Sequence, residues 1–370
     1  MKGKDLLIFS YDYPPTDGGI ARLCQEIASG MGMYYKSVTV LTRKKIGHSI
    51  PYNYHKVKVV QLPSSRIAGE IAALWFLLTL KKRNNYDVLC GLWHPEAALA
   101  LLAGFENIFV LGHGTEFLSG KSSFRKNFWL PIYCKWVLGN VKKTIANSHY
   151  TQKLILDINA NSNCEVLPLG VNHNFFKPKD RIKNNEKLQL CTVSRIQQFK
   201  GHDFVLKTLA QLPVEFKNKI EWHIAGTGSY LSQLKEMVLN LGLSDQVFFH
   251  GFVKDELLPE FYSQADVFVL CTREEEKSTS VEGFGLVFLE AQATGIPVIG
   301  TNTGGIPDAI EQKNGGWLIG QDNEEELTDL LKILLIDKSI AQSMGEKARK
   351  RVEEKCTWEQ YCYCLNEIMK

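Results

Sequence analysis

Short apolar runs of strand length alternate with helical stretches along the first half of the chain. The first run, DLLIFSY at residues 5–11, leads into a glycine turn at Gly18 and Gly19 and then into a helical pattern over residues 21–31. Five further runs are similar: SVTVLT, DVLCGL, IFVLGH, TIANSH and CEVLPLG, beginning at residues 37, 87, 108, 144 and 164. Strands that alternate with helices predict a parallel sheet covered on both faces.

The same rhythm restarts after a polar, proline-containing linker, FFKPKDRIKNNEK at residues 175–187. Its strand-like runs are LQLCTVS, IEWHIAG, QVFFHG, DVFVLCT and IPVIGT, beginning at residues 188, 220, 246, 266 and 296. Helical patterns between them cover residues 202–211, 229–241, 255–264 and 286–294. We therefore predict an α/β protein of two Rossmann-like domains, residues 1–175 and 176–354, facing each other across a cleft. In open parallel sheets ligands bind beyond the carboxyl ends of the strands, so this cleft is the expected site.

The charge is distributed unevenly along a chain of ordinary globular composition, with 45% hydrophobic and 22% charged residues. Residues 1–180 carry 22 lysines and arginines against 12 acidic residues, and residues 181–370 carry 21 against 28. The net charge of +3 thus combines +10 in the first half with −7 in the second. This asymmetry indicates two modules, one of which meets something anionic.

Cysteine usage and hydropathy bear on the cellular compartment. The nine cysteines lack C-x-x-C spacing, which argues against a zinc site or a disulfide framework and favours a reducing compartment. The first residues reach a Tyr-Asp-Tyr-Pro-Pro turn too early for a signal peptide. The most apolar internal run, IAALWFLLTL at residues 71–80, is too short to span a bilayer. We expect a cytoplasmic protein, either soluble or peripheral on the inner face of the cell membrane.

Two cations follow the first strand of the second domain. Arg195 and Lys200 lie in RIQQFKG, the predicted loop at the carboxyl end of LQLCTVS. A loop of this length can turn both cations toward one point, which suits a diphosphate. The alternative is a pair of solvated surface cations, and the strand-end position favours the binding role.

Glycine turns follow two other strands. IAGTGSY at residues 224–230 contains Gly226 between a strand and a helix, where backbone N–H groups and the helix N-terminus favour an anion. Gly18 and Gly19 form a comparable turn after the first strand. Neither turn has the third glycine and the downstream acid of a dinucleotide fingerprint, so each by itself indicates little more than chain geometry.

Two glutamates flank a third glycine turn, in VEGFGLVFLEA at residues 281–291. Gly283 and Gly285 allow a tight strand-to-helix turn, with Glu282 beside it and Glu290 about one helical turn into the following helix. A carboxylate accepts two hydrogen bonds side by side, which matches the vicinal hydroxyls of a sugar ring. The alternative is Glu282 as a helix N-terminal charge and Glu290 as a surface residue.

The order of these motifs resembles that of the retaining glycosyltransferases of family 4, which have the two-domain GT-B fold. The matching segments are YPPTDGGI, ANSHYTQKLI, LPLGVN, VSRIQQFKGHD, WHIAGTGSYLSQLKEMV, VFFHGFV, and EGFGLVFLE with AQATGIPVIGTNTGGIPDAI. They fall in order over nearly the whole chain. EGFGLVFLE carries a Glu-x7-Glu motif. Within the family, this region most resembles the phosphatidylinositol mannosyltransferase branch, whose donor is GDP-mannose.

The resemblance implies a role for each matched position. Arg195 and Lys200 would bind the donor diphosphate, and Glu290 would bind the ribose hydroxyls. Glu282 and the backbone of Gly283, Phe284 and Gly285 would hold the donor sugar, and Gly251, Phe252 and Val253 would contact the base. Gly226 and Leu286 are further predicted donor-binding residues. In the first domain, Gly18 and Gly19 would approach the phosphates, and His113 would lie near the reactive carbon of the donor sugar. The final helix, residues 355–370, would pack back on the first domain.

The family reaction transfers a hexose from a nucleotide sugar, GDP-mannose or a UDP-sugar, to a lipid-linked or cell-surface polysaccharide acceptor. Positive charge develops on the sugar ring and negative charge on the leaving diphosphate, and Arg195, Lys200, Glu282 and His113 are the predicted catalytic residues. We expect no cofactor and no metal, because His94, Glu96, His113 and Glu116 fit no ligand spacing. Alternative functions are a sugar-nucleotide epimerase on the same fold, a non-catalytic sugar-binding protein and, less favoured, an NAD dehydrogenase.

A basic and aromatic segment, residues 121–143, is a candidate membrane contact. It contains Lys121, Arg125, Lys126, Lys135, Lys142 and Lys143 with Phe128, Trp129, Tyr133 and Trp136. Basic residues beside aromatic anchors suit an anionic membrane interface, whereas an ordinary surface helix with a core-facing apolar side is the alternative. Nucleic acid is not expected as a partner, because this interleaving occurs only here.

Overall fold

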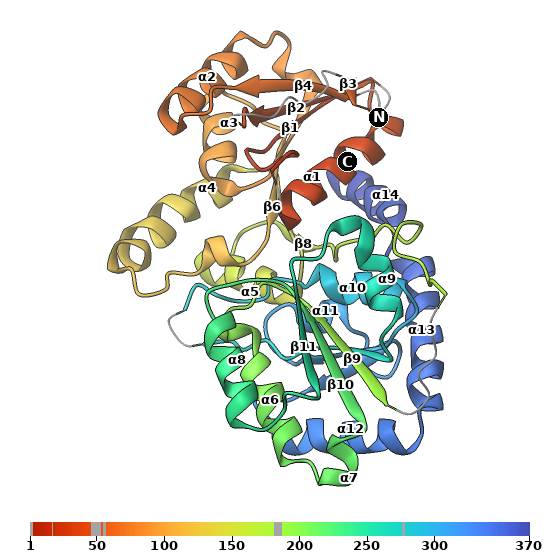
Figure 1. The fold of residues 1–370 in the computed structure, drawn as a ribbon. Coiled ribbons are helices and arrows are strands. Elements are labelled where there is room, and N and C mark those ends of the chain that lie inside the picture. The colour runs from red at the N-terminus through yellow and green to blue at the C-terminus, as the bar shows by residue number, and fades with distance from the viewer. Residues whose placement is uncertain (1–2, 17, 46–52, 55–56, 181–186, 276–277) are drawn as a thin grey trace. The chain divides into compact units, whose positions relative to one another are not determined.

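The chain divides into two compact units, each with its own parallel sheet (Figure 1). The structure is a computed structural model that describes residues 3–16, 18–45, 53–54, 57–180, 187–275 and 278–370. The first unit comprises residues 1–169 with 358–370, and the second comprises residues 170–357. Residues 181–186 of the predicted linker lie outside the described residues.

The first unit is built on an eight-stranded sheet in the order β3-β4-β2-β1-β5-β6-β7-β8. The strands are β1 (Asp5–Phe9), β2 (Ser37–Arg43), β3 (Asn53–Tyr54), β4 (Val57–Leu62), β5 (Tyr86–Cys90), β6 (Ile108–Gly112), β7 (Lys143–Ala146) and β8 (Cys164–Val166). Neighbouring strands pair in parallel except β3, which is antiparallel to β4. The central strands are buried almost throughout, which explains their continuous apolar sequences.

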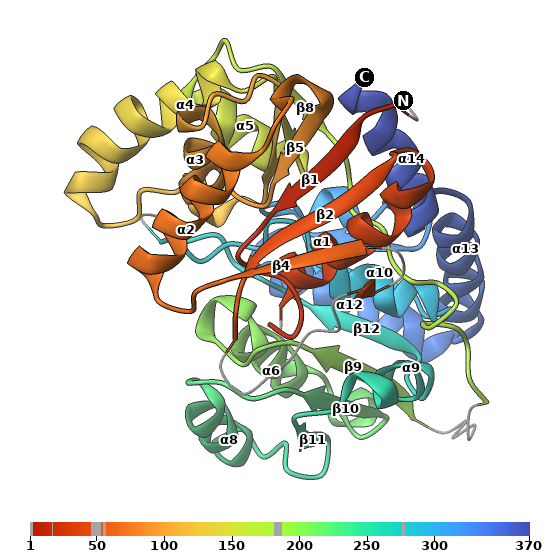
Figure 2. The same ribbon diagram turned by 90° about the horizontal axis from the view of Figure 1, so that it is seen from above.

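Helices cover both faces of this first sheet. They are α1 (Gly19–Gly30), α2 (Arg66–Thr79), α3 (Ala98–Leu102), α4 (Lys135–Asn140), α5 (His149–Ile158) and α14 (Trp358–Met369). Helices α2, α3 and α4 lie on one face, and α1 and α14 lie on the other (Figure 2). A β-carbon at Gly30 would lie 2.4 Å from Sγ of Cys362, so the bare backbone of α1 lets α14 pack closely against it.

The second unit contains a six-stranded sheet in the order β11-β10-β9-β12-β13-β14, with every pair parallel. The strands are β9 (Leu188–Val193), β10 (Ile220–Ala225), β11 (Val247–Gly251), β12 (Val267–Leu270), β13 (Val298–Thr301) and β14 (Gly316–Ile319). The helices are α6 (His202–Gln211), α7 (Val214–Lys217), α8 (Leu231–Asn240), α9 (Leu258–Ser263), α10 (Leu286–Ala293), α11 (Ile306–Ala309), α12 (Glu324–Ile336) and α13 (Ser339–Lys355). The core to which α6, α8 and α12 contribute includes Trp222 and Phe204.

Strands β3, β4 and β14, and helices α7, α11 and α12, were not predicted from the sequence. Strand β4 alternates buried and exposed residues, so it lacks a continuous apolar run. Strand β14 has only four residues and begins with a glycine. The apolar run at residues 71–80 forms most of α2, a helix that buries one stripe on the core and leaves another exposed. Among the described residues, no helix combines the length and apolarity needed to cross a bilayer.

Candidate active site

Loops at the carboxyl ends of the strands in the second unit carry most of the predicted donor-binding residues. The loop after β9 begins at Ser194, whose N–H donates to the carbonyl oxygen of Ala225 at 3.1 Å. The N–H of Ile196 donates to the carbonyl oxygen of Thr227 at 2.9 Å. The β9 loop and the β10 loop therefore continue the sheet beyond its strands and hold each other in place.

An ion pair between Lys200 and Glu282 joins two of these loops. Nζ of Lys200 donates to Oε2 of Glu282 across 82 positions of sequence. The two side chains are only 12% and 18% exposed, respectively. Partial burial strengthens the attraction between the charges and makes either charge costly without its partner. The structure thus brings together two residues that the sequence analysis assigned to the diphosphate and to the donor sugar.

Arg195 lies on the same loop but in a different environment. Its side chain is exposed, whereas that of Lys200, five positions later, is largely buried. Lys200 ends a short 3₁₀ turn, Gln198–Lys200, and Gly201 follows in a left-handed conformation with φ of +73°. A β-carbon at Gly201 would lie 1.9 Å from the carbonyl oxygen of Cys271, so only glycine allows the loop to lie against the end of β12.

The backbone of Glu282 is held by a second glycine turn. The N–H of Gly305 donates to the carbonyl oxygen of Glu282 at 2.8 Å. Gly304 has φ of +54°, and a β-carbon there would lie 2.5 Å from the same oxygen. Gly285, with φ of +92°, caps α10 immediately after Gly283 and Phe284. Of the predicted residues at this turn, Phe284 is buried in the core.

Glu290 lies inside α10, where it is only 5% exposed. Tyr262 of α9 donates its hydroxyl hydrogen to Oε2 of Glu290 at 2.9 Å. The alternative interpretation of Glu290 as a surface residue is therefore wrong. Nothing in the sequence signalled Tyr262, because a tyrosine in FYSQAD on a short helix has no distinguishing spacing.

The glycines of the β10 loop have a structural reason of their own. A β-carbon at Gly226 would lie 1.8 Å from the carbonyl oxygen of Ser194, and one at Gly228 would lie 2.1 Å from that of Ile196. The N–H of Gly226 donates to the carbonyl oxygen of Gly251 at 2.6 Å. These glycines permit close backbone packing between neighbouring loops, and the N–H of Gly226 is already engaged.

Residues 251–253, predicted to contact the base, follow β11. Gly251 has φ of +66°, which turns the chain as the strand ends. The side chain of Phe252 is largely exposed, and that of Val253 is half-buried. An exposed aromatic ring at a strand end is a surface on which a planar base can stack.

The first unit contains the remaining predicted residues. Gly18 precedes α1 with φ of +141°, and Gly19 is the first residue of that helix. Nε2 of His113 lies 2.8 Å from the carbonyl oxygen of Gly91, and the backbone N–H of His113 donates to Oε1 of Glu116 at 2.6 Å. Because a carbonyl only accepts, Nε2 of the His113 ring carries the hydrogen in this arrangement.

His94 and Glu96 have separate surroundings in the first unit. Nδ1 of His94 lies 2.9 Å from the hydroxyl of Tyr133, and its ring meets that of Trp129 edge to face. Oε1 of Glu96 accepts the N–H of Tyr11, and burial raises the pKa of Glu96 to about 8. Within the described part of the chain, no cluster of three or more His, Cys, Asp or Glu residues has a geometry that could hold a metal ion.

Solved structures with a similar fold identify the architecture. The structure of Anabaena HepE in complex with UDP has a TM-score of 0.77 to this chain at 17% identity, covering 99% of both chains. The protein has the GT-B fold of two Rossmann-like domains that the sequence predicts.

Two family models match consecutive parts of the chain. Glycosyltransferase Family 4 matches residues 17–175, and Glycosyl transferases group 1 matches residues 174–351. The chain therefore belongs to the family 4 glycosyltransferases, as its motifs predict. It is therefore a transferase rather than an epimerase or a non-catalytic sugar-binding protein.

Curated relatives align with nearly the whole chain. A protein of Mycobacterium tuberculosis named GDP-mannose-dependent alpha-(1-6)-phosphatidylinositol monomannoside mannosyltransferase is 26% identical, over 99% of this chain and 98% of the relative. A protein of the same name from Mycolicibacterium smegmatis is 29% identical, over 98% of each.

The Lys200–Glu282 pair generates a test by substitution. We expect Lys200→Ala to lower turnover by about 10²–10³-fold, because a cation placed at developing negative charge contributes roughly 2–4 kcal/mol to the transition state. Arg195→Ala should lower turnover with almost no change in melting temperature, because its side chain is exposed. Steady-state kinetics and thermal melts measure both effects.

Lys219→Ala is the matched control, because Lys219 is an exposed lysine at the opposite, amino end of β10. Near-normal turnover of the Lys200→Ala or Arg195→Ala enzyme would remove that cation from the diphosphate site.

Proposed function

We propose that the protein transfers a hexose from a nucleotide sugar to a lipid-linked or cell-surface polysaccharide acceptor, with retention of configuration at the sugar carbon. The observation that carries this proposal is the Lys200–Glu282 pair at the strand ends of the second sheet. GDP-mannose is the first donor to test, because the two mycobacterial relatives carry that donor in their names. The UDP bound to HepE supports a UDP-sugar as the second candidate.

The donor is held in this proposal by residues of opposite charge. Lys200 and Arg195 bind the diphosphate, and Glu290 accepts hydrogen bonds from the ribose hydroxyls. Glu282 and the backbone at Gly283–Gly285 hold the transferred sugar. A lysine whose ammonium already lies against a carboxylate is preorganised, since little further ordering is needed when the phosphate arrives.

The proposed reaction exchanges one bond at the sugar carbon for another. The bond from carbon 1 to the phosphate oxygen breaks, and the acceptor hydroxyl oxygen forms a new bond to carbon 1 on the same face. The acceptor proton passes to the departing phosphate oxygen, so the nucleoside diphosphate leaves as the second product. Lys200 and Arg195 stabilise the charge that accumulates on it, and Glu282 acts on the sugar rather than as a nucleophile.

The first experiment measures this reaction directly. Purified protein is incubated with GDP-mannose or UDP-glucose and vesicles containing phosphatidylinositol monomannoside, with and without excess chelator. We expect release of the nucleoside diphosphate and a lipid product heavier by one hexose, at the same rate in chelator. Loss of activity in chelator with recovery on adding Mn²⁺ or Mg²⁺ contradicts the metal-free mechanism, and no transfer from any GDP- or UDP-sugar contradicts the function.

Substitutions of Glu290 and Glu282 should have different effects on nucleotide binding and on turnover. Glu290→Gln should weaken binding of the bare nucleoside diphosphate and of the donor alike, by about tenfold, because both contain the ribose and a hydrogen bond to a charged group contributes roughly 1.5–3 kcal/mol. Glu282→Gln frees the ammonium of Lys200 from its carboxylate, so the bare diphosphate should bind equally well or tighter while turnover falls.

Titration calorimetry with the nucleoside diphosphate, combined with steady-state kinetics, separates these patterns. Glu236→Gln on the exposed side of α8 is the control. If Glu282→Gln weakened the bare diphosphate as much as Glu290→Gln did, the assignment of one glutamate to each sugar would be wrong.

We also propose that residues 121–143 contact an anionic membrane surface. Four exposed apolar side chains recur every four residues and form an apolar ridge: Phe124, Phe128, Ile132 and Trp136. Lys121, Lys126 and Lys135 are exposed in the same segment. In contrast, Trp129 and Tyr133 pack inward on Trp93 and His94, so they support the core rather than the surface.

Not every basic residue of this segment is available for such a contact. Arg125 donates to the carbonyl oxygens of Leu118 and Glu116, and Lys143 pairs with Glu165. Helix α2 of the same unit adds a second exposed apolar stripe, which consists of Ile67, Ile71, Trp75 and Leu78. A helix with apolar residues on one exposed stripe favours the membrane interface.

Vesicle flotation tests the contact. We expect binding to vesicles containing phosphatidylserine and little binding to purely zwitterionic ones. The double variant Phe128→Ala, Trp136→Ala should bind at least tenfold more weakly, because burying one large apolar side chain contributes about 1.5–3 kcal/mol. Leu239→Ala, an exposed leucine of α8 in the other unit, is the control. Unchanged flotation of the double variant would assign the ridge another role.

A further inference from the structure

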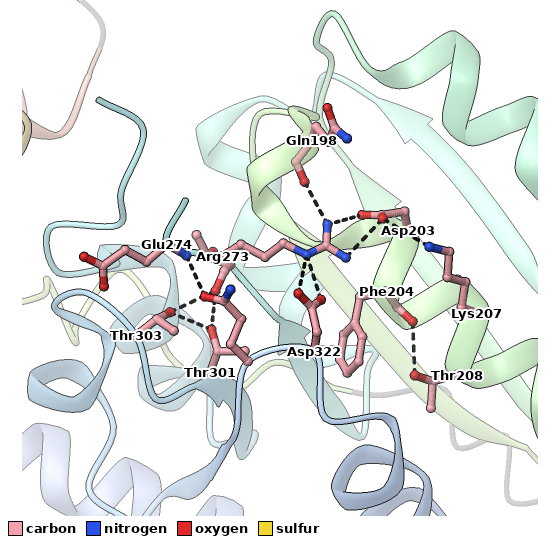
Figure 3. Close-up of polar contacts among 12 residues, drawn as sticks. Gln198, Asp203, Phe204, Lys207, Thr208, Arg273, Glu274, Thr301, Thr303 and Asp322 are labelled. Atoms are coloured by element: carbon pink, nitrogen blue, oxygen red, sulfur yellow. Dashed lines mark hydrogen bonds and ion pairs between the residues drawn. The ribbon is translucent and has the colours of Figure 1, made fainter. Parts of the chain in front are cut away.

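Arg273 occupies the junction of three loops at the carboxyl end of the second sheet (Figure 3). It follows β12, and its guanidinium lies between Asp203 of α6 and Asp322 of the loop after β14. Nη1 and Nη2 donate to the two carboxylate oxygens of Asp203 at 2.7 and 3.1 Å. Nε donates to both carboxylate oxygens of Asp322, at 2.7 and 3.0 Å. One cation thus links segments that lie far apart in the sequence.

The backbone around Arg273 is tied to the loop that carries Lys200. The N–H of Arg273 donates to the carbonyl oxygen of Phe199 at 2.6 Å, and Nη1 lies 3.5 Å from that of Gln198. Asp203 lies three positions after Lys200. Arg273 therefore contacts the loop immediately before and shortly after Lys200, and Gly201 between them lies against the carbonyl oxygen of Cys271.

These contacts engage all three nitrogens of the Arg273 guanidinium. Its side chain is 15% exposed, against 8% for Asp203 and 44% for Asp322. Burial by itself disfavours its charge, but the hydrogen bonds to two carboxylates outweigh burial and raise the pKa of Arg273 further. With Nε and both terminal nitrogens engaged, Arg273 is a poor candidate for binding a phosphate itself.

We propose that Arg273 is a positioning residue that sets where the ammonium of Lys200 lies. This inference rests on the proposed function, in which Lys200 stabilises the leaving diphosphate. The guanidinium contacts the carbonyl oxygen of Gln198 before Lys200 and the side-chain carboxylate of Asp203 after it. Glu282 holds the ammonium at the end of the Lys200 side chain. The loop after β14 takes part through Asp322, and through Gln321, whose side-chain oxygen accepts the N–H of Glu274 at 2.8 Å.

The geometry explains why arginine is needed at this position. A lysine has one ammonium group on a flexible chain and cannot span two carboxylates with paired hydrogen bonds as a planar guanidinium does. Arg273→Lys should therefore keep the charge and lose the rigid link. Asp322→Asn keeps the shape of its side chain but weakens one of the two links, and Asp203→Asn weakens the other.

The test is a double-mutant cycle between Arg273 and Lys200. We expect Arg273→Met to lower kcat by about ten- to a hundredfold in the wild-type background, since a small misplacement of a catalytic group has effects of this size. In the Lys200→Met background the same substitution should change kcat less than twofold. Arg273→Lys should fall between Arg273→Met and the wild type.

The matched control is Arg351→Met. Arg351 is also largely buried and paired with a carboxylate, that of Glu311, but it lies on α13 and does not contact the Lys200 loop. A merely structural role predicts that Arg273→Met and Arg351→Met lower the melting temperature alike while the folded fraction keeps its kcat. An equal loss of kcat from Arg273→Met in both Lys200 backgrounds would overturn the proposal.

A second measurement does not depend on the reaction. Acetylation of lysines by a succinimide ester, followed by peptide mass spectrometry, reports how accessible Lys200 is relative to Lys219. We expect Lys200 to be labelled slowly in the wild type and severalfold faster in Arg273→Met, or in Asp322→Asn should Arg273→Met fail to fold. Unchanged labelling would overturn the proposal even if transfer is observed. Faster labelling of Lys200 in the variant, without hexose transfer by the wild type, would contradict the proposed function and not the positioning role of Arg273.

Discussion

The ion pair of Lys200 and Glu282 is the interaction on which the second unit's candidate site depends. Both side chains are largely removed from water, so each charge would be costly by itself. Together they keep a cation at the carboxyl end of a parallel sheet, where open α/β folds bind their ligands. The ammonium of Lys200 in this pair is already placed for a ligand, because an entering diphosphate can take over part of the attraction that the carboxylate of Glu282 provides.

Close backbone packing makes this pair possible. The loops after β9, β10, β12 and β13 touch one another at positions where a β-carbon would collide with a carbonyl oxygen, notably Gly201, Gly226 and Gly304. Hydrogen bonds between these loops then replace the ladder of the sheet beyond its last strand residues. Loops held in this way behave as rigid extensions of the strands, which is what precise placement of a lysine requires.

The sequence predicted the fold class well because its central strands are buried on both faces. Runs such as DLLIF and LQLCTV are mostly apolar and almost wholly buried, and the glycine turns between strands and helices mark the loop positions. The half-exposed strand β4 and the four-residue strand β14 were not predicted, because their sequence patterns resemble those of loops. Helix α2 was noticed only as an apolar run, since one of its stripes is exposed.

Residues that act through a partner could not be predicted in the same way. Sequence motifs indicate Lys200 and Glu282 individually. Their contact was not predictable, because it joins positions 82 residues apart. Tyr262 matters because the buried carboxylate of Glu290 accepts its hydroxyl hydrogen, a contact that the sequence does not show. Arg273 sits in a charged stretch, TREEEK, that has the composition of an ordinary surface loop, and its two aspartates come from distant segments.

A crystal structure of the protein with GDP or UDP bound tests the central claim most directly. The account predicts diphosphate oxygens within hydrogen-bonding distance of Nζ of Lys200 and of the guanidinium of Arg195, with the ribose hydroxyls at Glu290. Lys200 should keep its place on the loop, with Glu282 still nearby. A nucleotide bound elsewhere, or one whose phosphates contact neither cation, would contradict the assignment of this ion pair to the leaving group.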